Sequence, residues 1–91
     1  MKTNYLFCYD IRDDRRLHRV YNRMKSWGLH LQYSVFFCSL TGQELQRLTD
    51  EIGEIIDPHM DDIRIYPLPA RPEAIVLGCG DRVPEGVEVV L

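Results

Sequence analysis

Residues 5–11 constrain the fold of this chain more than any other stretch. Their sequence is Tyr-Leu-Phe-Cys-Tyr-Asp-Ile, in which six of the seven residues are apolar. Such a run predicts a fully buried strand. Because an unpaired carboxylate is costly to bury, Asp10 is expected where the strand leaves the core, with its side chain at an opening. Two interpretations follow from spacing alone: Asp10 is a functional group, or it caps the next turn.

Length and composition set limits on the class of protein. Ninety-one residues allow one small domain with a marginal core, which favours a partner subunit. The hydrophobic fraction of 45% and the charged fraction of 27% are typical of a soluble globular chain. No apolar run approaches the roughly 20 residues of a membrane span, and no signal peptide is recognisable. We therefore expect a cytoplasmic protein with no membrane partner.

The cysteines and the charges narrow the chemistry. Three widely spaced cysteines with no C-x-x-C pair fit neither a disulfide framework nor a zinc site. Residues 1–40 carry seven Lys or Arg and three Asp, a net +4, whereas residues 41–91 carry four Arg and eleven acids, a net −7, and the two halves sum to −3. The net charge weakly disfavours nucleic-acid binding, but the basic N-terminal half could still form a binding surface for nucleic acid.

A helix is predicted after the first strand. Asp13 or Asp14 is a suitable N-cap, and Gly28 a suitable C-terminal stop. Helical spacing places one apolar stripe on this segment, made of Leu17, Val20, Tyr21, Met24 and Trp27.

Three arginines share a second face of the same helix. Arg16, Arg19 and Arg23 recur at three- and four-residue spacing. This face is either solvated or a stripe that contacts phosphates, and arginine is suited to bidentate phosphate contacts.

The middle of the chain predicts two further elements. Residues 29–40 form a second apolar stretch, which is either one long strand or a hairpin turning near Tyr33 and Ser34. Thr41 and Glu44 have the spacing of a capping box, which predicts a helix that ends before Pro58. Its buried face would hold Leu45, Leu48, Ile52, Ile55 and Ile56.

The last third begins with a strand and ends in a tail. Residues 62–68 alternate polar and apolar side chains and break at Pro67, which indicates a strand with one wet face. Prolines at 67, 69 and 72 then lead out of the domain. We therefore expect a domain over residues 1–69 and a tail over residues 70–91. The short apolar run at 74–77 is expected to be a strand that pairs with a sheet edge of another chain and so promotes dimerisation.

This order of elements predicts the fold class. Strand, helix, strand or hairpin, helix and strand fit an α+β protein of the ferredoxin-like β-α-β-β-α-β type, with an extra C-terminal strand. In that arrangement the first strand is central, so Asp10 would emerge near the middle of one end of the sheet.

Three motifs together resemble the small CRISPR-associated Cas2 family. They are Tyr9-Asp10-Ile11, then residues 13–16 (Asp-Asp-Arg-Arg), then Gly28-x-x-x-Gln32-x-Ser34-Val35-Phe36. The similarity extends over about residues 4–68. It implies a ferredoxin-like homodimer that cleaves RNA or double-stranded DNA with a metal ion. It also implies a partner, the integrase subunit Cas1 of the complex that captures new spacers.

The resemblance also implies roles for individual residues. Asp10 would be the catalytic residue and the Mg²⁺ ligand, facing its copy across the dimer axis. The cleft that binds nucleic acid would be lined by Tyr9, Arg16, Arg19, Ser34 and Phe36, with Arg23 on the arginine face. His30 stands at a position where the family often has arginine, and Phe37 where an acidic residue often follows.

The residues are compatible with metal-dependent hydrolysis, although one chain supplies few metal ligands. Phosphodiester hydrolysis needs an oxygen-bound cation, and one carboxylate per chain is a poor metal cage, whereas two copies across a dimer axis supply two. No His or Glu is clearly placed as a general base; His18 and His59 are expected at the surface. Two alternatives stay open: a non-catalytic dimeric scaffold that bridges integrase subunits and DNA, and an mRNA-cleaving toxin of the virulence-associated D type.

Overall fold

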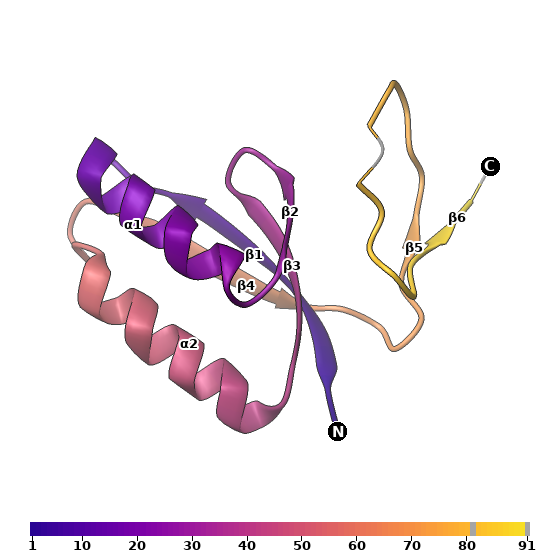
Figure 1. The fold of residues 1–91 in the computed structure, drawn as a ribbon, viewed down its shortest axis with the longest axis horizontal. Coiled ribbons are helices and arrows are strands. Elements are labelled where there is room, and N and C mark those ends of the chain that lie inside the picture. Colours follow the sequence, from indigo (N-terminus) through magenta and orange to yellow (C-terminus); the bar gives the residue numbers. More distant parts are fainter. Residues whose placement is uncertain (81, 91) are drawn as a thin grey trace.

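The computed structural model describes residues 1–80 and 82–90 (Figure 1). The elements follow in the order β1 (Thr3–Asp10), α1 (Asp14–Lys25), β2 (Leu29–Gln32), β3 (Val35–Leu40), α2 (Gly42–Ile55), β4 (Asp62–Pro67), β5 (Glu73–Ala74) and β6 (Glu88–Val89). The stretch 29–40 is therefore a hairpin, because Tyr33 and Ser34 separate β2 from β3. Asp13 caps α1 by accepting a hydrogen bond from the Arg16 N–H.

The main sheet has the strand order β2-β3-β1-β4, and all its neighbouring strands are antiparallel. This order confirms the ferredoxin-like prediction and places β1 in the interior of the sheet. Cross-strand pairs fix the register at the centre, where Phe7 lies between Phe36 of β3 and Ile65 of β4. A buried central strand explains why residues 5–11 read as an almost continuous apolar run.

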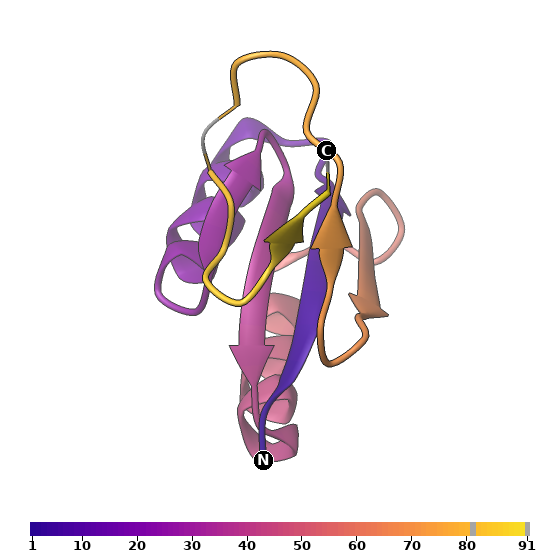
Figure 2. The same cartoon turned by 90° about the vertical axis from the view of Figure 1, so that its right-hand side faces the viewer.

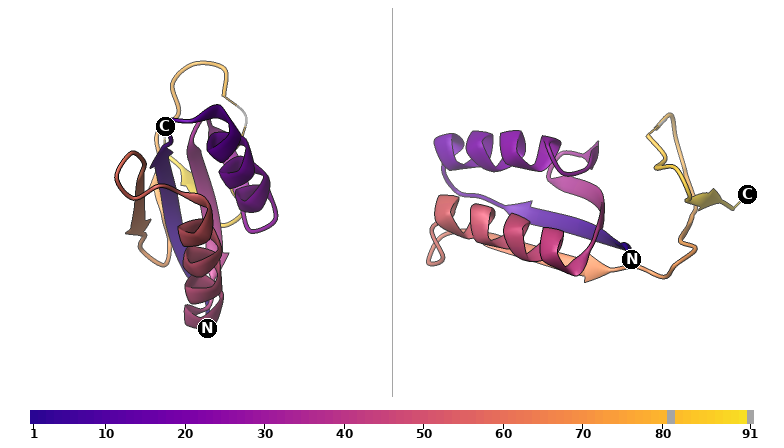
Figure 3. Two further views of the ribbon diagram at one scale, coloured as in Figure 1. Left: turned by 90° about the vertical axis from the view of Figure 1, so that its left-hand side faces the viewer. Right: turned by 60° about the horizontal axis from the view of Figure 1, so that its bottom comes forward.

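Both helices pack on one face of this sheet (Figures 1 and 3). The core between them contains Phe7, Tyr9, Val20, Met24, Phe36, Cys38, Leu40, Leu48 and Ile52. Strand side chains alternate between faces, so the odd-numbered residues of β1 enter this core and the even-numbered ones lie on the opposite face. Asp10 therefore belongs to the face that the helices leave open.

One expected helix boundary is confirmed, and another is shifted. Thr41 and Glu44 form the predicted capping box at the start of α2, with hydrogen bonds of 2.8 and 3.1 Å. α1 ends at Lys25 with Ser26 as its C-cap, so Gly28 is not the helix stop and Trp27 lies beyond the helix. Gly28 is required for a steric reason instead. A Cβ atom there would lie 2.5 Å from the Cys38 Sγ and 2.5 Å from the Phe37 carbonyl oxygen, so only glycine allows this close approach to β3.

The tail differs from the expectation. Its strand covers only residues 73–74 and pairs in parallel with β6 of the same chain, so residues 75–77 lie outside any strand and are exposed. The tail covers part of the open sheet face around Leu6, Leu31 and Phe37 (Figure 2). The tail residues that line this contact are Pro72, Glu73, Ala74, Val76, Arg82, Val83, Pro84 and Val87. Pairing with a second chain stays a prediction, and residues 81 and 91 of the tail lie outside the described residues.

In the part of the chain that the structure describes, no helix is long and apolar enough to cross a membrane.

Candidate functional site

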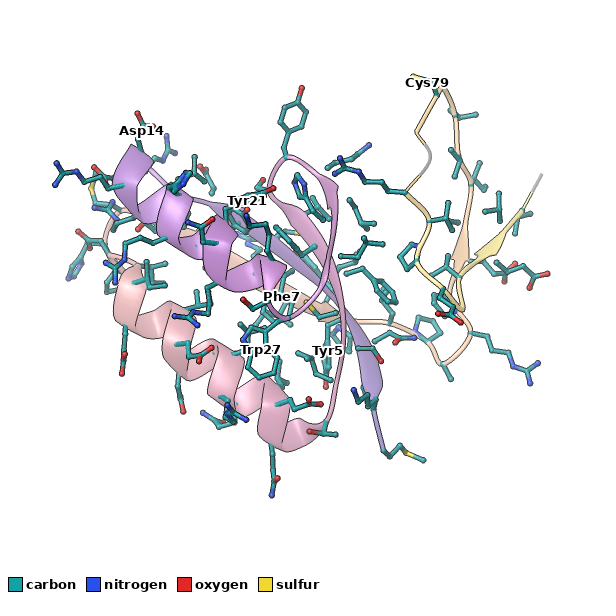
Figure 4. All side chains as sticks on the ribbon, in the orientation of Figure 1. Tyr5, Phe7, Asp14, Tyr21, Trp27 and Cys79 are labelled. Carbon is teal, nitrogen blue, oxygen red and sulfur yellow. The ribbon has the colours of Figure 1, made fainter. Side chains whose placement is uncertain are left out.

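Polar side chains gather at the end of the sheet where β1 stops. β1 ends at Asp10 and β4 begins at Asp62, while the turn between β2 and β3 lies at the same end. The first turn of α1 and the loop between α2 and β4 complete this region, with Asp14 marking the start of α1 (Figure 4). This end of the sheet is the site predicted for Asp10.

The Asp10 side chain is exposed and makes one charged contact. Its Oδ2 lies 3.6 Å from the Arg12 Nη2, and 67% of the side chain is accessible to solvent. Within residues 1–80 and 82–90, no hydrogen bond uses the Asp10 carboxylate, and the helix cap is Asp13. The capping interpretation of Asp10 is therefore wrong for this structure, and its carboxylate is free to bind a ligand.

A second carboxylate lies beside Asp10. Asp62 is its direct partner in the antiparallel pair of β1 and β4, so both side chains are on the open face of the sheet. Asp62 also has an arginine neighbour, since the Arg64 Nε donates to its Oδ2 at 3.1 Å. Sequence reasoning missed Asp62. Only the register of β4 against β1 reveals the pairing, and that register could not be read from the chain.

The buried side chain of Asp61, the residue before Asp62, ties three segments together. Its carboxylate accepts hydrogen bonds from the Arg16 Nε at 2.7 Å and Nη2 at 3.0 Å. It also accepts the backbone N–H of Arg12 at 2.9 Å and that of Asp57 at 2.9 Å. Its side chain has no exposed surface. We call this group of four residues the Asp61 junction.

The Asp61 junction is a strongly polarised carboxylate site. The hydrogen bond from Arg16 is the main cause that holds the pKa of Asp61 well below its usual range, and the two backbone N–H donors add to it. These interactions outweigh desolvation, which acts in the opposite direction. Asp61 therefore stays ionised and fixes the turn that follows Asp10.

The three arginines predicted as one stripe have different surroundings. Arg16 is committed to the Asp61 junction, and Arg23 lies 3.9 Å from the Glu51 carboxylate, which is a weak contact. Arg19 has no ion pair among the described residues. It borders a cavity of about 520 Å³ between α1 and α2, which Asn22, Arg23, Glu51, Glu54 and Ile55 also line. Of the stripe, Arg19 is the side chain most available to a phosphate.

Two of the predicted aromatic residues belong to the core. Phe36 has no exposed surface, and Tyr9 is 6% exposed. Burial, reinforced by the neighbouring Tyr21, raises the pKa of Tyr9 to about 12. The rings of Tyr9 and Phe36 are stacked at 6.3 Å between centroids. In this conformation neither presents a ring face for stacking on nucleic acid; they support the site from behind.

His30 and Ser34 hold the hairpin in place. His30 Nε2 lies 2.6 Å from the Tyr33 carbonyl oxygen, and the Arg82 Nη1 lies 3.1 Å from His30 Nδ1. The Ser34 carbonyl oxygen accepts the Tyr9 N–H at 3.1 Å, which joins the hairpin to β1 directly before Asp10. Asp10, Tyr9, Arg16 and Ser34 thus lie at one end of the sheet. Arg19 and Arg23 border the groove between α1 and α2 instead, and Phe36 belongs to the core.

The donor set is sparse for a metal ion. Among residues 1–80 and 82–90 there is no group of three or more His, Cys, Asp or Glu side chains that could hold one. Asp10 and Asp62 together offer two exposed carboxylates on one face. That set fits Mg²⁺, which protein sites often bind through one or two carboxylates while waters and phosphate oxygens complete the shell.

Comparison with known proteins gives one consistent family. The sequence model described as "CRISPR associated protein Cas2" matches residues 3–74. The CRISPR-associated endoribonuclease Cas2 2 of Thermodesulfovibrio yellowstonii is 55% identical over 89 residues, which cover 98% of each chain.

Solved structures agree with that match. A hypothetical protein from Thermus thermophilus superposes with a TM-score of 0.82 at 38% identity, covering 90% of this chain and 98% of the other. A chain in a partial Cas6-RT-Cas1–Cas2 complex gives a TM-score of 0.69 at 30% identity, covering 76% of this chain and 75% of that one.

Proposed function

Because the chain belongs to the CRISPR-associated protein Cas2 family, we propose that it is a metal-dependent endonuclease whose centre is Asp10. The observation that carries this proposal is the pair of exposed carboxylates, Asp10 and Asp62, on the open face at the end of β1 and β4. The relative from T. yellowstonii is named an endoribonuclease, which favours RNA over duplex DNA as the substrate.

Mg²⁺ would be held by Asp10, with Asp62 beside it. When bound, the ion polarises the phosphoryl oxygen and lowers the pKa of a bound water. The protein's own contribution is to hold Asp10 in a fixed position. The Asp61 junction fixes the backbone at Arg12, so Asp10 meets the substrate from a rigid strand end and not from a loose loop.

Arginines would supply the charge that a phosphate needs. The Arg12 guanidinium already lies 3.6 Å from Asp10, and its side chain is 63% exposed. A substrate phosphate near Asp10 would therefore meet a guanidinium that can donate two hydrogen bonds. Arg19 lies further along α1 and would contact a neighbouring phosphate.

A homodimer would complete the site and bury the open face. Leu6, Leu31 and Phe37 lie on that face and border a groove that the chain's own tail covers only in part. Ile75, Val76 and Leu77 of the tail are exposed. A second copy would cover these apolar groups and bring a second Asp10 and Asp62 to the same axis. Dimerisation and nucleic-acid binding are both part of the proposal.

A second candidate function is a non-catalytic scaffold in the cytoplasm that binds an integrase subunit. The likeness to a chain of a Cas1–Cas2 assembly favours it, and the sparse donor set is compatible with it. Both functions share the fold, the dimer and the Cas1 partner, and they differ only in whether Asp10 performs chemistry.

A cleavage panel separates the two candidates. Purified protein is incubated with single-stranded RNA and with duplex DNA, in Mg²⁺ and in EDTA, beside Asp10→Asn and Asp62→Asn. The nuclease proposal expects Mg²⁺-dependent cleavage that Asp10→Asn abolishes. Cleavage that persists in Asp10→Asn would come from a contaminant. No cleavage by folded wild-type protein, together with retained binding to a Cas1 subunit, would establish the scaffold.

A further inference from the structure

We propose that the β2–β3 hairpin and the adjoining side of α1 form a subsite that stacks one unpaired nucleobase of an RNA strand. The subsite would bind the same RNA strand that Asp10 is proposed to cleave, so this inference rests on the proposed nuclease function. Its residues are Tyr33 at the hairpin tip and Leu17, His18 and Tyr21 on α1.

A cavity with an aromatic lining exists at this place. Its volume is about 430 Å³, and it is lined by Tyr9, Asp14, Leu17, His18, Tyr21 and Tyr33. Tyr21, Tyr33 and the His18 imidazole give the cavity its flat π-surfaces, whereas Tyr9 is only 6% exposed and forms part of its floor. Base stacking on aromatic rings is the usual way in which proteins hold single-stranded nucleic acid.

Tyr33 is the most unusual residue of the cavity. It is 95% exposed, although a tyrosine ring gains by burial. It also has a positive φ of 28°, the only such value for a residue other than glycine among those described. A non-glycine residue in this region of φ is strained, and strained positions gather at ligand-binding sites. The hairpin thus holds a bare aromatic ring in solvent at a cost to its backbone.

The Tyr21 side of the cavity is held in place by neighbouring rings. Tyr21 lies on the side of α1 that faces the hairpin (Figure 4). It meets the His30 ring edge-on at 5.2 Å and the Phe36 ring at 5.8 Å. The Lys25 Nζ lies 4.9 Å from the centre of the Tyr21 ring. An aromatic side chain held in place in this way is suited to a flat ligand, because little entropy is lost when the ligand enters.

The cavity is joined to the cleavage site. Tyr9 lines it and directly precedes Asp10, and the Tyr9 N–H donates to the Ser34 carbonyl next to Tyr33. Tyr9 faces the helices whereas Asp10 faces the open side, so a strand that turns over this end of the sheet would reach both. Its phosphates would pass Arg12 and Arg15, both exposed at the start of α1. These arginines beside the cavity are complementary to phosphates and not to a neutral apolar segment of protein, whereas Asp14, which lines the cavity itself, disfavours a phosphate inside it and leaves that space to the uncharged base.

The shape of the cavity favours an unpaired base. Bases in a duplex are stacked on each other and cannot turn sideways onto Tyr33 without being flipped out. In a single strand the free-energy cost of exposing one base is much smaller. The relative from T. yellowstonii is named an endoribonuclease, which makes an RNA strand the occupant to test first.

Binding measured without cleavage tests the subsite. Fluorescence anisotropy in EDTA compares an RNA octamer with an octamer of abasic ribose phosphates of equal length and charge. Tyr33→Gly removes the ring while glycine accepts the positive φ, so the fold is kept. We expect Tyr33→Gly to weaken binding of the RNA octamer about 5- to 100-fold and to leave the abasic octamer unchanged. Tyr33→Phe keeps the stacking surface and should bind like wild type.

The control variant is Met60→Ala, which removes an exposed apolar side chain from the loop before β4. It should bind both octamers as wild type does. Equal loss on both octamers in Tyr33→Gly, or no loss on either, would overturn the subsite. A DNA octamer that depends on Tyr33 while the RNA octamer does not would overturn the choice of RNA.

The subsite and the nuclease can fail separately. If folded wild-type protein cleaves nothing in Mg²⁺ but the RNA octamer still depends on Tyr33, the nuclease is wrong and the base subsite stands. If Mg²⁺-dependent cleavage is present and binding of both octamers ignores Tyr33, the nuclease stands and the subsite is wrong.

Discussion

Asp10 and Asp62 face each other across β1 and β4, so one chain presents two exposed carboxylates side by side on the open face of its sheet. Directly opposed residues of antiparallel strands have Cβ atoms about 4.5–5.5 Å apart, and like charges in such pairs repel. Arg12 and Arg64 each neutralise one member from outside. This arrangement is suited to a cation that removes the repulsion.

Magnesium should therefore stabilise the wild-type protein. At ten times its dissociation constant, Mg²⁺ would add about 1.4 kcal/mol, which is roughly 6–11 °C in Tm for a domain of this size. Thermal melts with Mg²⁺ and with EDTA measure this shift, and Asp10→Asn and Asp62→Asn should each reduce it. Asp50→Asn on the far helix is the matched control and should retain it. A Tm that ignores Mg²⁺ in every protein would contradict a shared metal site.

Arg19 should contribute directly to nucleic-acid binding, whereas Arg16 should contribute to the stability of the fold. Removing one phosphate contact lowers the slope of log K against log salt by about 0.7 for a single strand. Arg19→Ala is expected to show this change with an unchanged Tm, whereas Arg16→Ala should lower the Tm because it breaks the Asp61 junction. Arg71→Ala in the tail is the control. A slope identical in wild type and Arg19→Ala would return Arg19 to a purely solvated face.

Acid should weaken the Asp61 junction. The folded-state pKa of Asp61 is depressed, so its stabilising effect is complete above the unfolded value of about 3.9 and is lost as the pH falls toward the folded value. Asp61→Asn should have a lower Tm than wild type at pH 7. The gap should narrow progressively below about pH 4, as seen in melts from pH 7 to pH 2. A gap that stays constant over this range would show that Asp61 acts by packing and not by charge.

Gly28→Ala should destabilise the turn between α1 and β2. The added Cβ would meet the Cys38 Sγ and the Phe37 carbonyl oxygen at 2.5 Å each, and one of these is backbone that cannot easily give way. Overpacking of this kind costs about 1–3 kcal/mol. Urea denaturation measures the change, with Gly53→Ala as a control because nothing lies within 4 Å of its added Cβ. Equal stability of the two variants would show that β3 shifts to accommodate residue 28.

Truncation after Pro69 should change the oligomeric state. Without the tail, Leu6, Leu31 and Phe37 of the open face lose their cover. We expect monomers or aggregates in sedimentation at low micromolar concentration, where the full-length chain is expected to be a dimer. A truncated chain that remains a well-folded dimer would show that the tail is dispensable for association.

Much of the fold follows from local sequence signals. The run at residues 5–11 marks a central strand, and the caps at Asp13 and Thr41 mark the starts of both helices. These signals concern residues close together in the chain, so they could be read without the structure. The choice between one long strand and a hairpin at residues 29–40 could not be made in this way, because Tyr33 has none of the usual turn chemistry and adopts its positive φ only in context.

The site was less predictable than the fold, for a physical reason. Asp62 is a candidate site residue only because β4 pairs with β1 in a register that sets it opposite Asp10. Asp61 is one because it contacts Arg16 of α1, which is far away in sequence. Arg16 and Arg19 look equivalent by helical spacing, yet the first is bound to Asp61 and the second is not. Pairings over such separations depend on tertiary packing, which single-residue patterns do not encode.

The hydrogen bond from the Arg12 N–H to Asp61 has a consequence for how the molecule assembles. It joins positions 49 residues apart, so the chain must lose the entropy of a long loop before this contact can form. The helices and the β2–β3 hairpin can form locally, but the end of the sheet that carries Asp10 is complete only when the last strand has docked. Hydrogen exchange at the Arg12 amide therefore reports the opening of that end specifically. In a nascent or partly open chain the carboxylates at this end of the sheet are not yet held in place, so the proposed cleavage requires the closed fold.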